Sequence, residues 1–511
     1  MKPSSPEQAT HHAAPVGAHD VRLDASVRPS RWVNPTPTAR YQLVVIGAGT
    51  AGLVTAAGAA GLGARVALIE RHRMGGDCLN VGCVPSKGLI APARHWADAR
   101  SAASSFHGPA VDGDGDFAAV MERMRRIRAD IAPVDGAERF RSLGVDVYFG
   151  DAAFASENAV VVEGQTLRFR KAVIASGARA AAPPIPGLPS VPYLTNETLF
   201  DLTSRPEHLI VIGGGPIGCE MAQSFARLGS RVTLIDRGAR LLPRDDSDAS
   251  AIVQRSLTHD GVVFHMQATI KGVESVNGGV VVQLTRNGQN VSVSGDRLLV
   301  AIGRAPNVEG LALEKARVAF TPQGVTVDDR LCTSNPNIYA CGDVCSRFQF
   351  THSADFQARA VIQNALFFGR KKASALVIPW ATYTSPEVAH VGHTAQSARD
   401  AKVEIQTFTV PMHDVDRALL DGETEGFAKV HVKTGTDTIV GATVVAPHAS
   451  ELLAEVTLCM TNKLGLGAIG ATIHPYPTQG DALRKCADAW RKTKLTPTVR
   501  SVFAAWFKWF S

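Results

Sequence analysis

The sequence predicts an α/β fold of three parts: two helix-flanked parallel sheets, followed by a smaller α+β domain. Three observations support this fold class. A glycine-rich turn between an apolar strand and a helix occurs twice, and a second strand ending in an acidic residue follows each copy. After about residue 380 the pattern changes to short alternating strands. A chain of 511 residues is also too long for one ordinary domain.

The composition excludes several classes of protein. Hydrophobic residues make up 45% and charged residues 20%, which is typical of a globular chain and not of a disordered one. The net charge of +6 is too small for a chain of this length to indicate nucleic-acid binding. Eight cysteines are too few for a disulfide scaffold.

Residues 1–40 predict a disordered tail. They carry six prolines and no periodicity, and they lack the apolar core of a signal peptide. His11 and His12 are interpreted as part of this tail and not as a metal site. The uncharged stretch 41–64 is long enough to cross a membrane, but its six glycines indicate a buried strand followed by a helix. We therefore expect a cytoplasmic protein whose thiols stay reduced.

The two glycine-rich turns share one spacing, with 23 positions from the first glycine to the acidic residue. Such a turn lets the backbone approach a pyrophosphate, whose charge rests on the following helix N-terminus, while the acid accepts hydrogen bonds from a ribose. Two Rossmann-like dinucleotide sites are predicted, with electron transfer between them. Their residues are Gly47, Gly49, Gly52 and Glu70 in the first copy and Gly213, Gly215, Gly218 and Asp236 in the second.

A cysteine pair directly follows the first copy. Cys78 and Cys83 lie in GGDCLNVGCVPSK, residues 75–87, and no second pair is close enough to complete a zinc site. Pro85 suits the first turn of a helix, and a helix N-terminus near Lys87 would stabilise a thiolate at Cys83. We interpret the pair as a redox-active dithiol beside the first dinucleotide.

These motifs resemble those of the flavin-dependent pyridine nucleotide–disulfide oxidoreductases, which include dihydrolipoamide dehydrogenase, glutathione reductase and mercuric reductase. The resemblance covers about residues 41–500, and GGDCLNVGCVPSK is its most specific motif. It implies an FAD-binding domain at 41–186 and 308–379, an NAD(P)-binding domain at 187–307 and a dimerisation domain at 380–511. It also implies a homodimer in which the partner's C-terminal domain completes each active site. Further matching segments are KAVIASGARAAAPPIPG (171–187), LLVAIGRAPN (298–307), TSNPNIYACGDV (333–344) and SPEVAHVGHT (385–394).

The resemblance implies a role for each motif residue. Cys83 matches the sulfur that contacts the flavin, and Cys78 matches the sulfur that exchanges with substrate. Lys87 and Glu220 match a pair beside the reactive edge of the flavin. The implied FAD-binding residues are Gly47, Gly49, Gly52, Glu70, Lys87, Gly177, Gly342 and Asp343, and the implied NAD(P)-binding residues are Gly213, Gly215, Gly218, Asp236, Arg237 and Gly303.

One segment departs from the pattern of the family's thiol-directed members. Those members carry a histidine near the C-terminus, with a glutamate five residues later, as acid and base. Alignment on Pro477-Thr478 puts Tyr476 and Asp481 at these positions, and His474 falls two residues early. Tyrosine is a poor base near pH 7, and mercuric reductase also has tyrosine there. Tyr476, Asp481 and His474 are the candidate proton-handling residues.

The departure favours a mercuric reductase-like enzyme that reduces a soft metal ion or a related small acceptor. The metal ion would be a substrate held by thiolates, and no resident metal site is predicted. True mercuric reductases have a vicinal cysteine pair near the C-terminus, whereas no cysteine follows Cys486 here. One alternative is a dihydrolipoamide dehydrogenase or another disulfide reductase. An alternative of another class is a non-catalytic flavoprotein that senses redox state or associates with membranes.

The second acidic residue predicts the choice of nicotinamide nucleotide. Asp236 would accept a hydrogen bond from the ribose 2′-hydroxyl and repel a 2′-phosphate, so NADH is favoured. The alternative is NADPH, because Arg237 and Arg240 would bind that phosphate.

The C-terminal segment combines positive charge with aromatic residues. Residues 484–511 hold seven basic residues and one acidic residue. Their net charge of +6 equals the net charge of the whole chain. The apolar residues of the segment follow helical spacing: Val499, Val502, Phe503, Trp506, Phe507 and Phe510. We expect a helix that packs on its own dimer; the alternative is a weak contact with a membrane surface.

Overall fold

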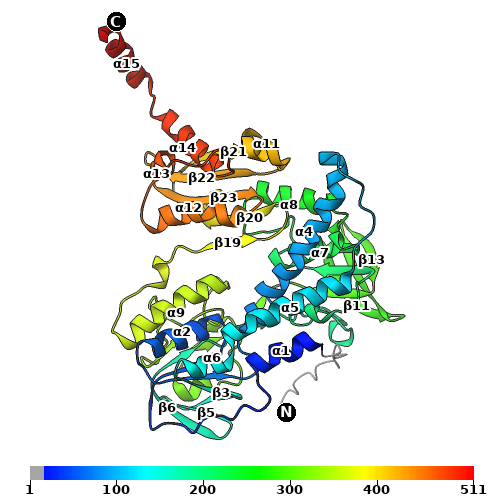
Figure 1. Cartoon of the computed structure of the whole chain (residues 1–511), viewed down its shortest axis with the longest axis vertical. Helices are drawn as coiled ribbons and strands as arrows, with labels where there is room; N and C mark the ends of the chain where they lie inside the picture. The colour runs from blue at the N-terminus through cyan, green and yellow to red at the C-terminus, as the bar shows by residue number, and fades with distance from the viewer. Residues whose placement is uncertain (1–16, 511) are drawn as a thin grey trace.

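The structure of the protein, a computed structural model, describes residues 17–510, and these form three packed units (Figure 1). The first unit contains a seven-stranded sheet with the order β3-β2-β1-β6-β5-β4, and β18 pairs with β6. β3, β2, β1, β6 and β18 run parallel, whereas β4 and β5 form an antiparallel extension. The strands are β1 (Tyr41–Ile46), β2 (Val66–Glu70), β3 (Val145–Phe149), β4 (Ala152–Ser156), β5 (Ala159–Val162), β6 (Gln165–Ile174) and β18 (Ile338–Ala340).

Helices of the first unit carry the residues that lead to the candidate site. The stretch 41–64 forms β1 and then α2 (Thr50–Gly61), as the glycines indicated. α2 lies beside α9 (Thr351–Leu366), which the chain supplies much later (Figure 1). Other helices of this unit are α3 (Gly76–Asn80), α4 (Cys83–Phe106), α5 (Phe117–Asp135) and α6 (Ala137–Ser142).

The second unit repeats the parallel arrangement on a smaller scale. Its four-stranded parallel sheet has the order β10-β9-β8-β14, and a three-stranded antiparallel sheet β11-β12-β13 accompanies it. The elements are β8 (His208–Ile212), α7 (Pro216–Arg227), β9 (Arg231–Ile235), α8 (Ser247–His259), β10 (Val263–His265), β11 (Thr269–Val276), β12 (Gly279–Arg286), β13 (Gln289–Gly295) and β14 (Arg297–Val300). Two short strands, β7 (Ala178–Ala180) and β15 (Arg304–Pro306), pair where the chain enters and leaves this unit.

The third unit is an antiparallel five-stranded sheet, order β19-β20-β23-β22-β21, covered by helices. The predicted alternating strands 427–433 and 439–446 are β22 and β23. Together the three units confirm the predicted fold class. The elements are β19 (Pro379–Thr382), β20 (Glu387–Gly392), α10 (Ala395–Asp400), β21 (Ile405–Pro411), α11 (Asp416–Asp421), β22 (Phe427–Lys433), β23 (Ile439–Ala446), α12 (Ala449–Thr461), α13 (Leu466–Ala471), α14 (Asp481–Thr493) and α15 (Pro497–Phe510).

One apolar cluster joins the three units. It combines buried side chains of α4, α5 and α7 with residues of β20, β22 and β23, so the start of α4 is held between two dinucleotide-type folds. Cluster members from these elements are Leu89, Ile90, Met121, Met124, Met221, Phe225, Val388, Phe427 and Val445. Burial of this apolar surface fixes the relative positions of α4 and α7, which matters for the site described below.

The prediction of a disordered tail is wrong for residues 17–40. Ala18–Val27 forms helix α1, whose Leu23 and Val27 are fully buried against α5. Trp32 donates its indole N–H to the Val147 carbonyl, and Asn34 exchanges two hydrogen bonds with the backbone of Phe149. Packing and edge contacts of this kind order a short helix that propensity alone would leave marginal. His11 and His12 lie outside the described residues.

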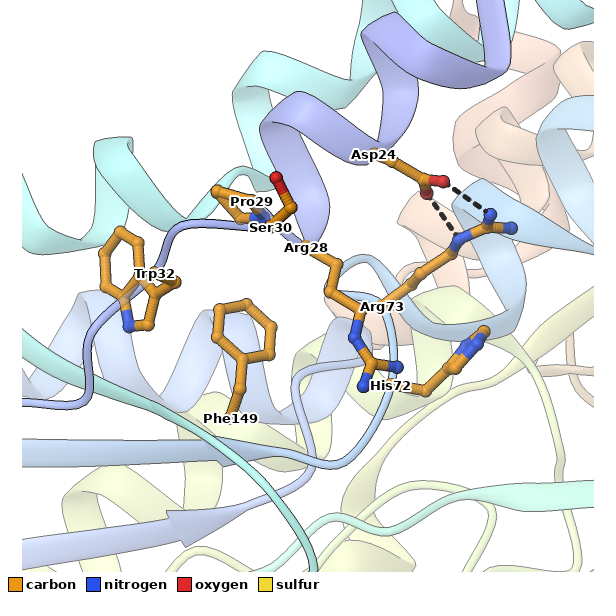
Figure 2. A pocket seen from close by; sticks show the side chains of 8 residues that line it. All are labelled: Asp24, Arg28, Pro29, Ser30, Trp32, His72, Arg73 and Phe149. Atoms are coloured by element: carbon orange, nitrogen blue, oxygen red, sulfur yellow. Dashed lines mark hydrogen bonds and ion pairs between the residues drawn. The ribbon is translucent and has the colours of Figure 1, made fainter. Parts of the chain in front are cut away.

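The segment after α1 borders a pocket of about 400 Å³ at the ends of β2 and β3 (Figure 2). Trp32 and Phe149 meet edge to face on one side of it, and Asp24 pairs with Arg73 on the other. This pocket lies next to the end of β2 and away from the two cysteines of GGDCLNVGCVPSK. Among the described helices, none is long and apolar enough to span a membrane.

Candidate functional site

The cysteine pair lies at the junction of two helices. Cys78 is in the short helix α3, and Cys83 is the first residue of α4. Both are free thiols, and the Cys83 sulfur lies 3.2 Å from the hydroxyl of Thr351, at the start of α9. Thr351 lies 268 positions after Cys83 and belongs to none of the motifs that predicted the site, so the sequence did not identify it.

The two thiols differ in acidity. The hydrogen bond from Cys78 makes the largest contribution to lowering the pKa of Cys83 to about 6. Thr351 and the charge of Lys87 contribute to the same shift, against the opposing effect of burial. The same hydrogen bond, together with burial, raises the pKa of Cys78. Cys83 also begins α4 after Gly82, which provides no side-chain cap, so the helix N-terminus favours a negative charge there. The geometry therefore provides a thiolate at Cys83 and a neutral thiol at Cys78 near pH 7.

An ion pair between a half-buried lysine and a buried glutamate lies one helical turn along α4. Lys87 Nζ is 3.0 Å from Glu220 Oε2, and Glu220 on α7 is only 5% exposed. The backbone N–H of Tyr383 donates to the other Glu220 oxygen at 2.9 Å, and Lys87 lies over the Tyr383 ring at 4.3 Å. Burial alone would lower the pKa of Lys87, but the Glu220 carboxylate outweighs it and raises that pKa. Lys87 therefore keeps its charge close to the Cys83 thiolate.

The first glycine turn forms a cradle that only glycine permits. A Cβ on Gly52 would lie 1.8 Å from the Gly47 carbonyl oxygen, and Gly47 itself has a φ of +101°. Gly49 caps α2 without a side chain, which leaves the first N–H groups of the helix available to an anion. The Glu70 carboxylate accepts from the backbone N–H groups of Ala48 and His72, both at 2.8 Å. These features fit the pyrophosphate and ribose of a dinucleotide.

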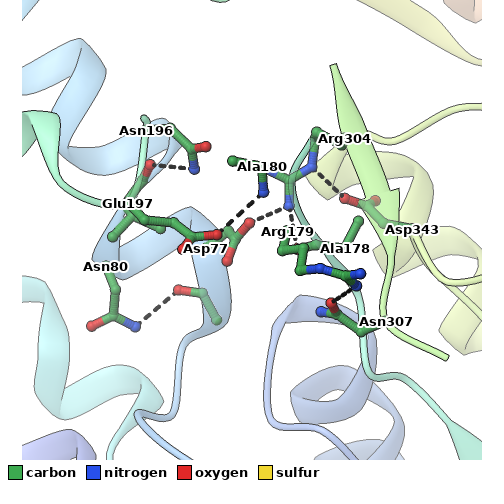
Figure 3. A network of polar contacts seen from close by, with 12 residues as sticks. Asp77, Asn80, Ala178, Arg179, Ala180, Asn196, Glu197, Arg304, Asn307 and Asp343 are labelled. Atoms are coloured by element: carbon green, nitrogen blue, oxygen red, sulfur yellow. Dashed lines mark hydrogen bonds and ion pairs between the residues drawn. The ribbon is translucent and has the colours of Figure 1, made fainter. Parts of the chain in front are cut away.

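Arg304 connects the cysteine segment with the other predicted FAD contacts (Figure 3). Its guanidinium bonds to the Asp77 carboxylate, to the Ala178 carbonyl at 2.7 Å and to Asp343 at 3.4 Å. Burial raises the pKa of Asp343, and Arg304 offsets part of that rise. Because Asp77 directly precedes Cys78, Arg304 links the cysteine helix to the Asp343 loop.

Two predicted FAD glycines lie close to this network. The Gly342 N–H donates to the Gln357 side chain at 2.9 Å. A Cβ on Gly177 would meet nothing within 4 Å, so this glycine borders open space. Arg304 follows Gly303 in LLVAIGRAPN, one of the segments that resemble the family. Its position there could have identified it as a site residue, but it was not among the predicted ones.

The second glycine turn is built like the first. A Cβ on Gly218 would lie 1.9 Å from the Gly213 carbonyl oxygen, whereas Gly215 and Gly303 border open space. The two Asp236 oxygens accept from the N–H groups of Gly214 at 2.6 Å and Gly238 at 2.5 Å. Each oxygen retains a lone pair for a ribose hydroxyl.

The two arginines after Asp236 have different surroundings. Arg237 is exposed beside the turn. Arg240 donates to the backbone carbonyls of Leu242, Pro243 and Asp245. Because these carbonyls hold the Arg240 guanidinium, it is not available to bind a 2′-phosphate, as the NADPH alternative requires.

The candidate proton-handling residues lie together in the third unit, but with partners that the sequence did not predict. The Tyr476 hydroxyl donates to Asp416 at 2.7 Å, and this hydrogen bond raises the pKa of Tyr476. His474 Nε2 lies 3.0 Å from Glu455 of α12. Asp416 and Glu455 come from distant segments without a motif, so spacing could not reveal them.

Asp481 does not serve as the partner of Tyr476. It pairs with Arg484 at 2.6 Å and with Lys485 at 3.2 Å at the start of α14. Although burial opposes the effect, these two cations lower the pKa of Asp481. In the described part of the single chain, neither Tyr476, His474 nor Asp481 hydrogen-bonds to the cysteine pair.

Known proteins resemble this chain over nearly its whole length. The mercuric reductase of Bacillus cereus is 34% identical over 472 residues, which is 92% of this chain and 74% of that protein. The dihydrolipoyl dehydrogenase of Geobacillus stearothermophilus is 33% identical over 88% of this chain and 95% of that protein. In the solved structure of the HOCl-induced flavoprotein disulfide reductase RclA from Escherichia coli, 29% of residues are identical and the TM-score is 0.77, over 88% of this chain and 99% of that one.

Two family models match consecutive parts of the chain. The model described as "Pyridine nucleotide-disulphide oxidoreductase" matches residues 41–358, and the model of its dimerisation domain matches residues 378–487. The second match supports a homodimer. FAD and NAD(P)H are the cofactors of this family, and the two glycine cradles fit them. The chain thus belongs to the pyridine nucleotide-disulphide oxidoreductases, as class I flavoenzymes with FAD and NAD(P)H as cofactors.

Proposed function

We propose that this enzyme passes electrons from NAD(P)H through FAD and the Cys78–Cys83 pair to a soft metal ion or a related acceptor. The observation that carries the proposal is Tyr476, whose phenol stands where thiol-directed members of the family have a histidine base. Its hydrogen bond to Asp416 raises its pKa above the ordinary value for tyrosine. At that ordinary pKa only about one phenol in a thousand is ionised at pH 7, and here the fraction is lower still.

The side chains support two-electron chemistry at the cysteine pair. FAD bound at the first glycine turn would supply the two-electron chemistry that connects a reduced nicotinamide with the disulfide. Cys83 receives its negative charge at the start of α4, where Cys78, Thr351 and Lys87 stabilise it. Glu220 holds Lys87 in place. Two thiolates are soft ligands, and reduction of M²⁺ to M⁰ consumes both electrons and releases one proton for each NAD(P)H oxidised.

A thiol substrate would place a different demand on the site. Proton transfer to and from such a substrate by a positioned base is typically worth a factor of 10²–10⁴. Tyr476 is protonated, and Asp481 is engaged by Arg484 and Lys485. The enzyme should therefore reduce disulfides slowly and soft metal ions faster.

A disulfide reductase or dihydrolipoamide dehydrogenase is the second candidate, because one contact favours it. His474 and Glu455 form a hydrogen-bonded pair at 3.0 Å, which has the composition of an acid–base dyad. This pair would have to act on the partner subunit's cysteines. A non-catalytic redox sensor is the third candidate, but it would have no need of the Lys87–Glu220 pair beside an acidic thiol.

The remaining assignments follow from the same site. We assign FAD to the first glycine turn and NADH to the second, where Asp236 faces the ribose and Arg240 is engaged elsewhere. Apart from the N-terminal tail, which helix α1 overturns from residue 17, the domain limits predicted from the sequence belong to this proposal. So does a cytoplasmic location, where NAD(P)H is made and the dithiol stays reduced.

A panel of acceptors tests the proposal. The enzyme is reduced anaerobically with two electrons and mixed in a stopped-flow instrument with Hg²⁺, Cu²⁺, lipoamide, glutathione disulfide or a quinone. We expect at least one soft metal ion to reoxidise it about 10²-fold faster than either disulfide. Lipoamide turnover faster than every metal ion would favour the second candidate, and no reoxidation by any acceptor would favour the third.

A further inference from the structure

The last helix of the chain has no part in the packed units. α15 (Pro497–Phe510) has no buried residue, and it extends from the third unit away from the rest of the molecule (Figure 1, red). Trp509, Phe507 and Phe510 are 76%, 67% and 66% exposed. The match to the dimerisation-domain model ends at residue 487, so the helix also lies beyond the part of the chain that the family uses for dimerisation.

The residues of α15 separate into two faces. At 100° per residue, the large apolar side chains cover one arc of about 160°. Smaller and polar residues occupy the opposite arc, with Arg500 at the boundary. The apolar arc holds Val499, Val502, Phe503, Trp506, Phe507, Trp509 and Phe510, and the opposite arc holds Thr498, Ser501, Ala504, Ala505 and Lys508. An arc of this width, rich in tryptophan and phenylalanine, is typical of helices that lie in a membrane interface.

Charge distinguishes between the surfaces that this helix fits. Residues 489–511 carry five basic residues and no acidic one, whereas residues 1–483 carry 46 of each sign. A second copy of the chain therefore has no net negative charge that would attract the helix. An anionic lipid leaflet offers both an apolar layer for the aromatic arc and negative headgroups for the basic residues.

We propose that α15 docks on membranes rich in anionic lipid, lying in the plane of the headgroups. At 1.5 Å per residue its 14 residues give about 21 Å, which suits a helix along the surface. The aromatic arc enters the boundary between headgroups and acyl chains. Lys492 and Lys494, at the end of α14 and just after it, face the phosphates. This attachment is independent of the electron acceptor, so either proposal can fail without the other.

Vesicle binding by the full-length holoenzyme tests the attachment. Vesicles of phosphatidylcholine alone are compared with vesicles that contain phosphatidylglycerol, and bound enzyme is measured by sedimentation. We expect binding to the anionic vesicles at least tenfold tighter than to the neutral ones, weakened by salt. Equal binding to both vesicle types, or none to either, would overturn the proposal.

A double variant and a matched control locate the contact. Trp506→Ser with Phe507→Ser should abolish vesicle binding and leave both the dimer mass and the anaerobic reduction by NADH unchanged. Phe368→Ser replaces an 86% exposed side chain two residues after α9, which lies at the opposite end of the molecule from α15 (Figure 1), and this variant should bind vesicles like the wild type. If the double variant instead dissociates into monomers in light scattering, α15 covers the partner subunit and the membrane assignment is wrong.

Discussion

The Tyr476 hydroxyl donates a hydrogen bond to the Asp416 carboxylate at 2.7 Å, across 60 positions of sequence. The phenol is 74% exposed, so this contact and not burial sets its protonation. A proton held between phenol and carboxylate is available for donation, but the site has no base at this position near pH 7. The substrate class proposed for the enzyme depends on this pair.

The two cysteines should be distinguishable by absorption. Cys83→Ser should abolish the long-wavelength band between thiolate and flavin, because it removes the sulfur whose charge Thr351 and Lys87 stabilise. Cys78→Ser should keep the band in the resting enzyme. Anaerobic spectra of the two variants at pH 8 decide the point, and the opposite pattern would exchange the two roles.

The same band should titrate near pH 6, because the pKa of Cys83 is lowered to about 6. The thiolate, and with it the band, is present above that pH and lost below it. Cys78→Ala removes the strongest stabilising hydrogen bond and should move the midpoint to higher pH. Lys87→Met should move it in the same direction by a smaller amount. A midpoint that stays near pH 6 in both variants would show that another group controls the thiolate.

The nucleotide preference should depend on Asp236. We expect the wild type to use NADH with a kcat/KM about tenfold above that for NADPH, or about 1.4 kcal/mol. Asp236→Asn removes the charge that repels a 2′-phosphate and should narrow the ratio. Arg255→Ala on α8, which removes an exposed pair with Glu425, serves as the control and should leave the ratio within about twofold. A tenfold preference of the wild type for NADPH would refute the assignment.

Helix α1 should stabilise the segment that carries Cys78. The Met74 N–H donates to the Val27 carbonyl at 3.1 Å, and Arg128 bridges Asp20 at 2.7 Å and the Asn80 carbonyl at 2.9 Å. Because Arg128 is 3% exposed, Asp20→Asn leaves a buried charge without its partner. We expect Asp20→Asn to lower the free energy of unfolding by about 1–3 kcal/mol and to lower the melting temperature.

A neighbouring ion pair provides the control for that experiment. Arg22 and Asp130 lie 2.6 Å apart with both side chains about half exposed. Asp130→Asn should therefore lower the free energy of unfolding by less than about 1 kcal/mol. Equal melting temperatures for Asp20→Asn and Asp130→Asn would mean that α1 does not support the cysteine segment.

Local patterns predicted much of this molecule. The two glycine turns impose backbone geometry that other residues cannot adopt, and the segments 427–433 and 439–446 form strands with the predicted limits. Helix α1 was missed because the six prolines of the first 40 residues dominate the composition, although residues 16–28 contain none. Burial of Leu23 and Val27 stabilises α1, and burial is a tertiary effect.

The site was predictable only where its residues share a motif. Cys78, Cys83 and Lys87 lie within ten positions, and helix geometry brings them together. The partners Thr351, Asp416 and Glu455 come from other segments and are single residues of common types. Nothing in their spacing distinguishes them from surface residues. Asp481 was expected beside Tyr476, but two cations one turn along α14 hold it.

The most direct test of the central claim is the ratio of Hg²⁺ to lipoamide turnover in wild type and in Tyr476→His. Both turnover rates are measured in each protein with and without His474→Ala, which removes the pair with Glu455. Tyr193→Phe, a phenol packed in the second unit, is the control. We predict that Tyr476→His raises lipoamide turnover about 10²-fold, that the metal turnover does not rise, and that His474→Ala has little effect. Rapid lipoamide reduction by the wild type that His474→Ala destroys would contradict the proposed substrate class and identify His474 as the base.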